Sequence, residues 1–164
     1  MQVQIQSLKV SHDLKDFDCG SAALNAWLVN MAKQQHIRNL ARTCVCVDIA
    51  MPSTVLGFYT LAVSEVSRNT LPNPNKYPQK VPVVRLGRFA TDLRWQGRGY
   101  GEILLLNALE RIAEIAENAG LAAVVVDAKD RKVAGYYAKF GFVSVPDNSL
   151  QLVLPLKTLL KALA

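Results

Sequence analysis

Three glycines at alternate positions, Gly97, Gly99 and Gly101, mark the part of the sequence whose residue types most clearly suggest chemistry. They follow an apolar run at 83–92 that predicts a strand, and they lead into an amphipathic run at 101–118 that predicts a long helix. Glycines let backbone N–H groups converge on a ligand without interference from a Cβ atom, and the first turn of a helix carries a partial positive charge. This order of strand, glycine loop and helix favours the binding of a pyrophosphate group.

Two neighbouring arginines, Arg94 and Arg98, add positive charge to the same loop. Two other phosphate-binding loops do not fit. No Lys-Ser or Lys-Thr pair follows the glycines, as a P-loop requires. The glycine spacing is GxGxG and comes late in the chain, whereas a dinucleotide-binding GxGxxG follows the first strand. A tight turn between a strand and a helix is the alternative explanation of the glycines.

Two motifs in this order resemble the GNAT superfamily of N-acetyltransferases. The segment Gln96–Gly101, with the sequence QGRGYG, resembles the Q/R-x-x-G-x-G/A loop that binds acyl-CoA in that superfamily. About forty residues later, Ala134–Phe142 resembles its A-x-x-[FY]-Y-x-x-x-G-F element, and the interval leaves room for one helix and one strand. The resemblance implies acetyl-CoA as the acetyl donor and a GNAT-like three-layer α/β fold, in which helices flank a mixed central sheet.

Four further segments resemble a narrower group, the acetyltransferase toxins of type II toxin–antitoxin systems. They are Phe17–Gly20, Leu24–Leu28, Gly57–Ala62 and Leu86–Asp92, so the resemblance extends over most of the chain. It implies an acceptor, the amino acid carried on charged tRNA, and a protein partner, a small ribbon-helix-helix antitoxin. Two alternatives stay open: acetylation of a small amine or a protein N-terminus, and a non-catalytic acyl-CoA-binding module.

The resemblance also implies roles for single residues. The strand backbone at Phe89, Ala90 and Thr91 would face the pantetheine arm, although the superfamily usually has a small aliphatic pair where Ala90 and Thr91 stand. Tyr137 matches the tyrosine that lies near the thioester sulfur. Adjacent helical residues point about 100° apart, so we expect Tyr136 to pack in the core instead. The residues expected to hold the pyrophosphate are Arg94, Gln96, Gly97, Arg98, Gly99, Tyr100, Gly101 and Glu102.

Acetyl transfer by direct attack of an amine is favoured, because no cysteine lies in a motif that would form an acyl-enzyme. The Tyr137 hydroxyl could donate to the departing sulfur. No strong general base is evident, since Glu65 and Asp92 lie near predicted strand ends and are expected to be solvated carboxylates. A free α-amine, with a pKa of about 7.7–8.0, needs less help from a base than a lysine at about 10.4.

The net charge of +6 favours an anionic partner, which acetyl-CoA and nucleic acid both satisfy, although such an excess is often an ordinary solvated surface. Arg38 and Arg42 are candidate tRNA-binding residues, and Tyr59 is a third candidate for substrate binding. We expect no metal, because the three cysteines and two histidines lack ligand spacing. Buried thiols of a reducing compartment are expected instead, and His12 and His36 are assigned no role.

Periodicity and turn residues predict one domain over residues 1–164, with a long proline-rich loop at 66–82, and the resemblance implies that this domain is a GNAT acetyltransferase. No apolar run is long enough to span a bilayer and no signal peptide is recognisable, so a cytoplasmic protein is expected. Fold analogy alone suggests a homodimer. The expected strands are 1–10, 43–49, 54–63, 83–92, 121–128, 142–145 and 150–154, and the expected helices are 22–35, 101–118 and 130–140.

Overall fold

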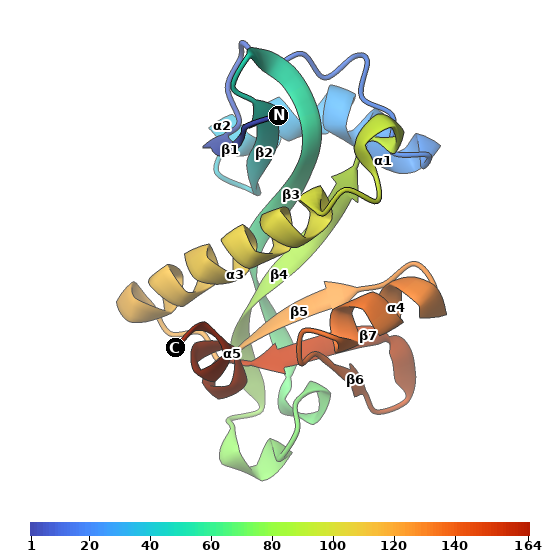
Figure 1. The fold of residues 1–164 in the computed structure, drawn as a ribbon. Coiled ribbons are helices and arrows are strands. Elements are labelled where there is room, and N and C mark those ends of the chain that lie inside the picture. The colour runs from blue at the N-terminus through green and yellow to red at the C-terminus, as the bar shows by residue number, and fades with distance from the viewer. The chain divides into compact units, whose positions relative to one another are not determined.

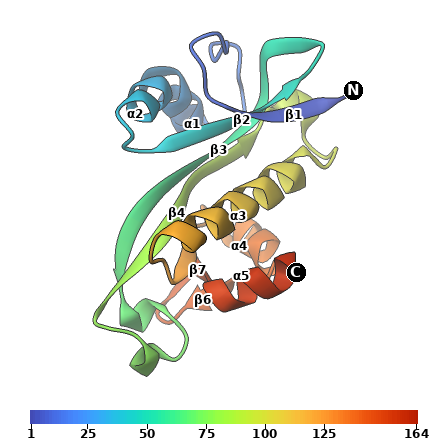
Figure 2. The same ribbon diagram turned by 90° about the vertical axis from the view of Figure 1, so that its left-hand side faces the viewer.

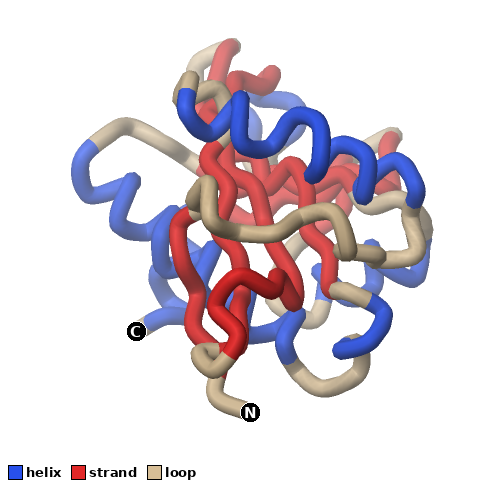
Figure 3. The backbone as a smooth tube through the Cα atoms, turned by 90° about the horizontal axis from the view of Figure 1, so that it is seen from above, coloured by secondary structure: helices blue, strands red, loops and turns tan.

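The computed structural model describes residues 1–164 as seven strands and five α-helices, labelled in Figure 1. Figure 3 shows the helices in blue and the strands in red along the backbone. The strands are β1 (Val3–Ser7), β2 (Arg42–Asp48), β3 (Met51–Ser67), β4 (Lys80–Thr91), β5 (Ala123–Asp127), β6 (Val143–Val145) and β7 (Asn148–Pro155). The helices are α1 (Ala22–Trp27), α2 (Lys33–Ile37), α3 (Tyr100–Asn118), α4 (Arg131–Ala138) and α5 (Leu156–Leu163).

The strands are hydrogen-bonded in the order β1-β2-β3-β4-β5-β7-β6. β4 and β5 are parallel, whereas β1 with β2, β2 with β3, β5 with β7 and β6 with β7 are antiparallel. The sheet is therefore mixed, and the predicted α/β class is confirmed. The parallel pair follows from the connection through α3, because parallel neighbours need a long crossover.

The chain forms two compact units, and β3, β4 and α3 contribute residues to both. The first unit consists of Met1–Ala62 and Gly87–Ala108, and the second of Val63–Leu86 and Leu109–Ala164. Each unit thus combines two segments that are distant in the sequence.

The first unit contains the antiparallel ladder of β1, β2 and β3, and Figure 2 shows β1 beside β2. α1 begins where the Ser21 side chain accepts a hydrogen bond from the N–H of Leu24, as the sequence predicts. A π-helical segment, Leu28–Ala32, joins α1 to α2, so the single predicted helix 22–35 is three helical pieces. The core consists of Leu8, Leu14, Phe17, Leu28, Ala32, Val45, Val47, Val55, Phe58 and Ala90.

The second unit is built on β5, whose residues Ala123 to Val126 are all buried, as expected of a continuous apolar strand. β5 pairs with β4 from Val83 to Leu86 on one side and with β7 on the other. Apolar side chains of these strands and of the segment before β4 pack together. They are Leu71, Val81, Val83, Ala123, Val125, Val145 and Val153.

Three sequence-based expectations about elements need correction. The turn between β2 and β3 is at Ile49–Ala50, so Met51–Ser53 already belongs to β3. The expected loop 66–82 contains the end of β3, two 3-10 turns and the start of β4. α5 is an additional helix that was not expected, although Pro155 before it and leucines at helical spacing are signals for it.

No helix is long and apolar enough to cross a membrane. No group of three or more His, Cys, Asp or Glu side chains is arranged to hold a metal ion. The thiols of Cys44 and Cys46 are buried, whereas Cys19 is half-buried, and all three are free.

Candidate active site

The glycine loop lies in the first unit, between the end of β4 and the start of α3. A 3-10 turn, Leu93–Trp95, leads from the strand into it. Gly97 and Gly99 have φ angles of +76° and +87°, which side chains with a Cβ atom rarely adopt. No heavy atom lies within 4 Å of the position that a Cβ atom would occupy at either glycine. The loop therefore has an open backbone surface of the kind that a pyrophosphate needs.

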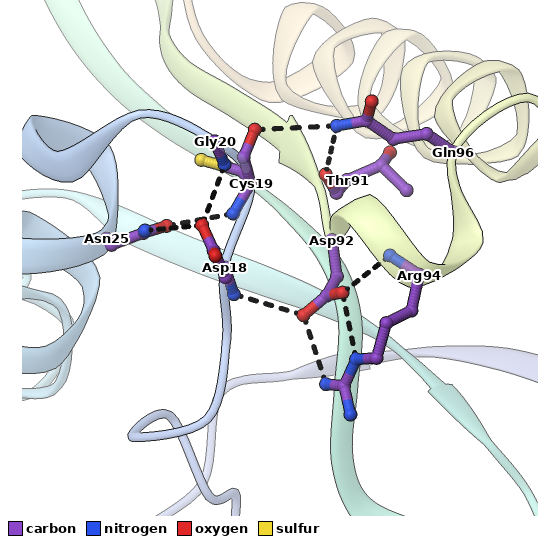
Figure 4. Close-up of polar contacts among 8 residues, drawn as sticks. All are labelled: Asp18, Cys19, Gly20, Asn25, Thr91, Asp92, Arg94 and Gln96. Carbon is purple, nitrogen blue, oxygen red and sulfur yellow. Dashed lines mark hydrogen bonds and ion pairs between the residues drawn. The ribbon is translucent and has the colours of Figure 1, made fainter.

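Asp92, at the beginning of this loop, is a buried structural carboxylate rather than the solvated one expected from the sequence. Its side chain is 1% exposed, and it forms an ion pair with Arg94 at 3.0 Å. Its Oδ1 accepts hydrogen bonds from the backbone N–H and the Nε of Arg94, and its Oδ2 accepts from Nη2 of Arg94 and from the N–H of Asp18 (Figure 4). Burial alone would raise the pKa of Asp92, but these hydrogen bonds and the charge of Arg94 lower it overall.

This geometry makes Asp92 a poor general base, because its lone pairs are occupied and its pKa is lowered. The other carboxylate considered, Glu65 in the second unit, is exposed, with 58% of its side-chain surface accessible and Lys80 4.0 Å away. The expectation of a solvated carboxylate is confirmed for Glu65 and wrong for Asp92.

The predicted pyrophosphate residues fall into two groups. Arg94 and Gln96 are already engaged: the guanidinium of Arg94 stacks on the Trp95 ring at 4.3 Å in addition to its ion pair, and Gln96 Nε2 donates to the Thr91 carbonyl at 2.9 Å. The others are the glycines themselves, Arg98, which is exposed between Gly97 and Gly99, and the first turn of α3. Contact of these residues with a pyrophosphate stays a prediction.

The strand segment predicted to hold the pantetheine arm lies at the end of β4. Pairing of β4 with β5 ends at Leu86 and Val126, so Phe89, Ala90 and Thr91 lie beyond the β5 ladder. Gly57 of the neighbouring strand β3 faces this segment closely: a Cβ atom there would lie 3.0 Å from the Ala90 carbonyl oxygen and 2.7 Å from Leu104. Gly57 thus lets β3 approach the strand closely and fixes its position.

The candidate substrate residues of the first unit differ in exposure. Tyr59 is fully buried, and its hydroxyl donates to Asn107 Oδ1 at 2.6 Å. Arg38 and Arg42 are exposed, at the end of α2 and the start of β2, and Arg42 also donates to the carbonyl of His36. Tyr59 therefore has a packing role in this structure, and its contact with substrate stays a prediction. The two arginines are accessible to solvent.

Arg88 of β4 forms a cation–π stack with Trp27 of α1, which was not expected from the sequence. The guanidinium of Arg88 stands 4.0 Å from the ring centroid of Trp27, whose ring in turn stacks on Phe58. Burial lowers the pKa of Arg88. The toxin-like segments that contain Arg88, Trp27 and Phe58 thus meet in the first unit.

Tyr137 belongs to α4 in the second unit. The structure reverses the expected burial of the tyrosine pair, because Tyr137 is 5% exposed, whereas Tyr136 is half-buried. The Tyr137 ring packs against Tyr136 and Phe142, with ring centroids 5.7 and 5.4 Å apart. Burial, and then the electrostatic interaction with the neighbouring Tyr136, raise the pKa of Tyr137 above its ordinary value of 10.0, so its hydroxyl stays protonated at neutral pH.

Residues 16–142 match the Acetyltransferase (GNAT) family, and the chain belongs to that family. It is therefore an N-acetyltransferase, and the superfamily and fold predicted from the sequence are confirmed.

More specific similarities point to one group within the family. A tRNA-acetylating toxin of Mycobacterium tuberculosis is 33% identical over 147 residues, which are 88% of this chain and 87% of that protein. The structure of AtaT complexed with acetyl-methionyl-tRNAfMet has a TM-score of 0.91 and 30% identity, covering 99% of this chain and 100% of AtaT. A tyrosine-to-phenylalanine mutant of the AtaT toxin, bound to the C-terminus of the antitoxin AtaR and to acetyl-CoA, has a TM-score of 0.85 and 28% identity, with 99% and 98% covered.

Proposed function

We propose that this N-acetyltransferase transfers the acetyl group of acetyl-CoA to the α-amine of aminoacyl-tRNA and acts as the toxin of a type II toxin–antitoxin pair. The observation that carries the proposal is the similarity to a tRNA-acetylating toxin over 88% of the chain. The likeness to a structure that holds acetylated methionyl-tRNA supports the same acceptor class. We further propose that residues 1–164 work as one acetyltransferase domain, in the cytoplasm, where charged tRNA is found.

The donor side of the reaction is assigned to the first unit. Backbone groups of Phe89, Ala90 and Thr91 bind the pantetheine arm, and the loop from Arg94 to Glu102 holds the pyrophosphate. The open space at Gly97 and Gly99 supports this assignment, because backbone N–H groups there can approach a phosphate without a clash. Acetyl-CoA supplies the activated acetyl group as a thioester.

Tyr137 is assigned as the acid that assists departure of the sulfur. In the balanced step, the amine nitrogen forms a bond to the carbonyl carbon, the carbon–sulfur bond breaks, and the amine loses one proton while the thiolate gains one. The protonated hydroxyl of Tyr137 donates toward the sulfur as negative charge develops there. Its raised pKa supports the role of hydrogen-bond donor, since the hydroxyl does not ionise at neutral pH.

The acceptor side needs no strong base. A free α-amine has a pKa of about 7.7–8.0, and an ester on the same carbon withdraws electron density and lowers it further. The burial and pairing of Asp92 and the exposure of Glu65 are in keeping with this, because neither carboxylate is tuned as a base. An activated α-amine thus fits these residues better than a lysine side chain.

Two macromolecular partners follow from the same reasoning. Charged tRNA is the acceptor, and the exposed Arg38 and Arg42 contact its phosphates. The neutralising partner is an antitoxin, and the AtaT structure bound to the C-terminus of the antitoxin AtaR supports a partner of this kind. We propose the ribbon-helix-helix type from the resemblance of the sequence alone. A homodimer is proposed by fold analogy.

The proposal is tested with labelled acetyl-CoA, purified protein and total charged tRNA. Label should appear on charged tRNA, be absent from tRNA that was deacylated beforehand, and leave the tRNA when its ester is hydrolysed. Expression of the chain alone should arrest growth, and the Tyr137→Phe variant should not. Harmless expression together with unlabelled charged tRNA would exclude the toxin and leave a small amine or a protein N-terminus as acceptor.

A further inference from the structure

The first residues of the loop proposed to bind acetyl-CoA form hydrogen bonds with a segment that is distant in the sequence. The N–H of Asp18 donates to Asp92 Oδ2 at 3.0 Å, and the N–H of Leu93 donates to the Asp18 carbonyl at 2.8 Å. Asp18 and Asp92 are 74 positions apart in the chain, and the bond between them joins a backbone N–H to a side-chain carboxylate (Figure 4). Because Asp92 is buried, an unpaired oxygen there would be costly, so this connection is strongly favoured.

A second connection runs through the side chain of Gln96, immediately before the first glycine of the loop. Its Nε2 donates to the Thr91 carbonyl at 2.9 Å and to the Cys19 carbonyl at 3.4 Å. One amide group therefore bridges the end of β4 and the segment before α1. Only a donor can serve there, since both partners are carbonyl oxygens.

The segment on the other side of these bonds is itself a closed network. Asp18 Oδ1 accepts from the N–H of Gly20 at 2.9 Å and from Nδ2 of Asn25 at 3.0 Å, and Asn25 Oδ1 accepts from the N–H of Cys19 at 3.0 Å. The N–H of Gly20 and the side chain of Asn25 lower the pKa of Asp18. Asn25 belongs to α1 and the Ser21 side chain caps that helix, so the network includes the beginning of α1.

We propose that Asp92 and Gln96 are positioning residues that transmit occupancy of the acetyl-CoA loop to residues 18–25 and to the start of α1. The inference rests on the proposed function in one respect, that acetyl-CoA is the ligand of the loop. Binding of a pyrophosphate to Gly97 and Gly99 fixes the backbone next to Gln96, and the two connections then restrict opening of residues 18–25. Donor binding thereby orders a part of the molecule that does not itself belong to the glycine loop.

Hydrogen–deuterium exchange on the full chain, with and without saturating acetyl-CoA, measures this coupling directly. The N–H groups of Asp18, Cys19, Gly20 and Asn25 are all hydrogen-bonded within the network, so their exchange reports its opening. Acetyl-CoA should slow exchange both in the loop at 97–103 and at 18–25. Calorimetry on the same samples measures the affinity for acetyl-CoA.

Gln96→Glu is the discriminating variant, because it keeps the shape of the side chain but places a carboxylate against two carbonyl oxygens. We expect acetyl-CoA to bind about tenfold more weakly and, at saturation, to protect 97–103 but no longer 18–25. Asp92→Asn, which should fold with reduced stability, is expected to lose the same protection. Gln34→Glu, at an exposed position of α2 in the same unit, is the matched control and should behave as the wild type.

The possible results separate the inference from the proposed function. Tight binding of acetyl-CoA without slower exchange at 18–25 in the wild type overturns the inference and leaves the proposed function intact. Unchanged protection at 18–25 in saturated Gln96→Glu also overturns it. A wild-type chain that shows no heat of binding with acetyl-CoA overturns both.

Discussion

At the scale of single residues, the hydroxyl of Tyr137 is the group on which turnover should depend. Tyr137→Phe is expected to lower kcat by about 10²-fold or more with nearly unchanged affinity for acetyl-CoA, because it removes a proton donor and keeps the ring. Steady-state kinetics and calorimetry check this. Tyr136→Phe is the matched control and should have the smaller effect; the reverse order would move the acid to Tyr136.

The backbone at Gly99 allows an equally direct test of donor binding. Its φ of +87° is strained for any residue with a Cβ atom, and the space beside it is open, so a side chain would stand where a phosphate approaches. Gly99→Val should abolish acetyl-CoA binding in a folded protein, as measured by calorimetry and circular dichroism. Gly120→Ala is the control, because Gly120 also has open space but no positive φ. Unchanged affinity in folded Gly99→Val would exclude the loop as donor site.

Residue types alone predicted part of this site and missed the rest. The glycine spacing indicated the open loop correctly, because positive φ angles are a local property of glycine. The burial of Asp92 was missed, since it depends on Asp18, which is 74 positions away in the chain. Asp92 before a short turn was nevertheless a recognisable capping signal, because its side chain accepts from the N–H of Arg94.

At the scale of elements, the corner formed by α2 and β2 depends on a neutral histidine. The Nδ1 of His36 accepts from the Thr43 N–H at 3.0 Å, and its Nε2 lies 3.2 Å from the Ser7 hydroxyl. Burial, and then the charge of Arg42, lower the pKa of His36 from its ordinary value of 6.5. A proton on Nδ1 would place one donor against another, so the corner needs the unprotonated ring.

This depressed pKa makes stability depend on pH. The unfolded chain binds a proton near pH 6.5 more readily than the folded one. The neutral His36 ring therefore contributes to folding stability above pH 6.5, and this contribution is lost as the pH falls through the pKa of His36 in the folded protein. The free energy of unfolding, from denaturant titrations between about pH 7.5 and 5, should decrease with acidity. In His36→Asn, whose amide oxygen can replace Nδ1 as acceptor, the decrease should be smaller; an identical slope would contradict this origin.

Periodicity predicted the long elements well and the short or irregular ones poorly. The helix expected at 101–118 is Tyr100–Asn118, because nineteen residues give an amphipathic pattern many repeats. The π-helical segment Leu28–Ala32 cannot be recognised in the spacing of apolar residues, since its residues continue the helical period of the flanking helices closely. Helix Leu156–Leu163 was overlooked although its leucines are regularly spaced, because the strand before it was expected to end the fold.

At the scale of the whole molecule, the net charge of +6 suits a phosphate-rich acceptor such as tRNA. Binding of charged tRNA, and with it acetylation, should weaken steeply as the salt concentration rises, because each contact between a cationic side chain and a phosphate releases a counterion. The KM for charged tRNA, measured from low to physiological salt, tests this. The KM for acetyl-CoA should change less.

A charge reversal assigns part of that salt dependence to one position. Arg38→Glu should raise the KM for charged tRNA and reduce its salt slope while leaving acetyl-CoA affinity unchanged, since Arg38 is exposed and lies outside the glycine loop. Lys157→Glu, at an exposed position of α5, changes the net charge equally and serves as control. If both substitutions raise the KM for charged tRNA equally, Arg38 contributes only general surface charge and no specific contact.

The unequal burial of the cysteines offers a built-in attachment point for a fluorophore. Cys44 and Cys46 are buried on β2, and burial raises the pKa of Cys46 to about 11, so that thiol resists alkylation at neutral pH. Cys19 is the more accessible thiol, and its carbonyl is the acceptor of the Gln96 amide. A small environment-sensitive dye coupled to the unmodified chain should therefore label this position first and report donor binding as a change in emission, without any engineered residue.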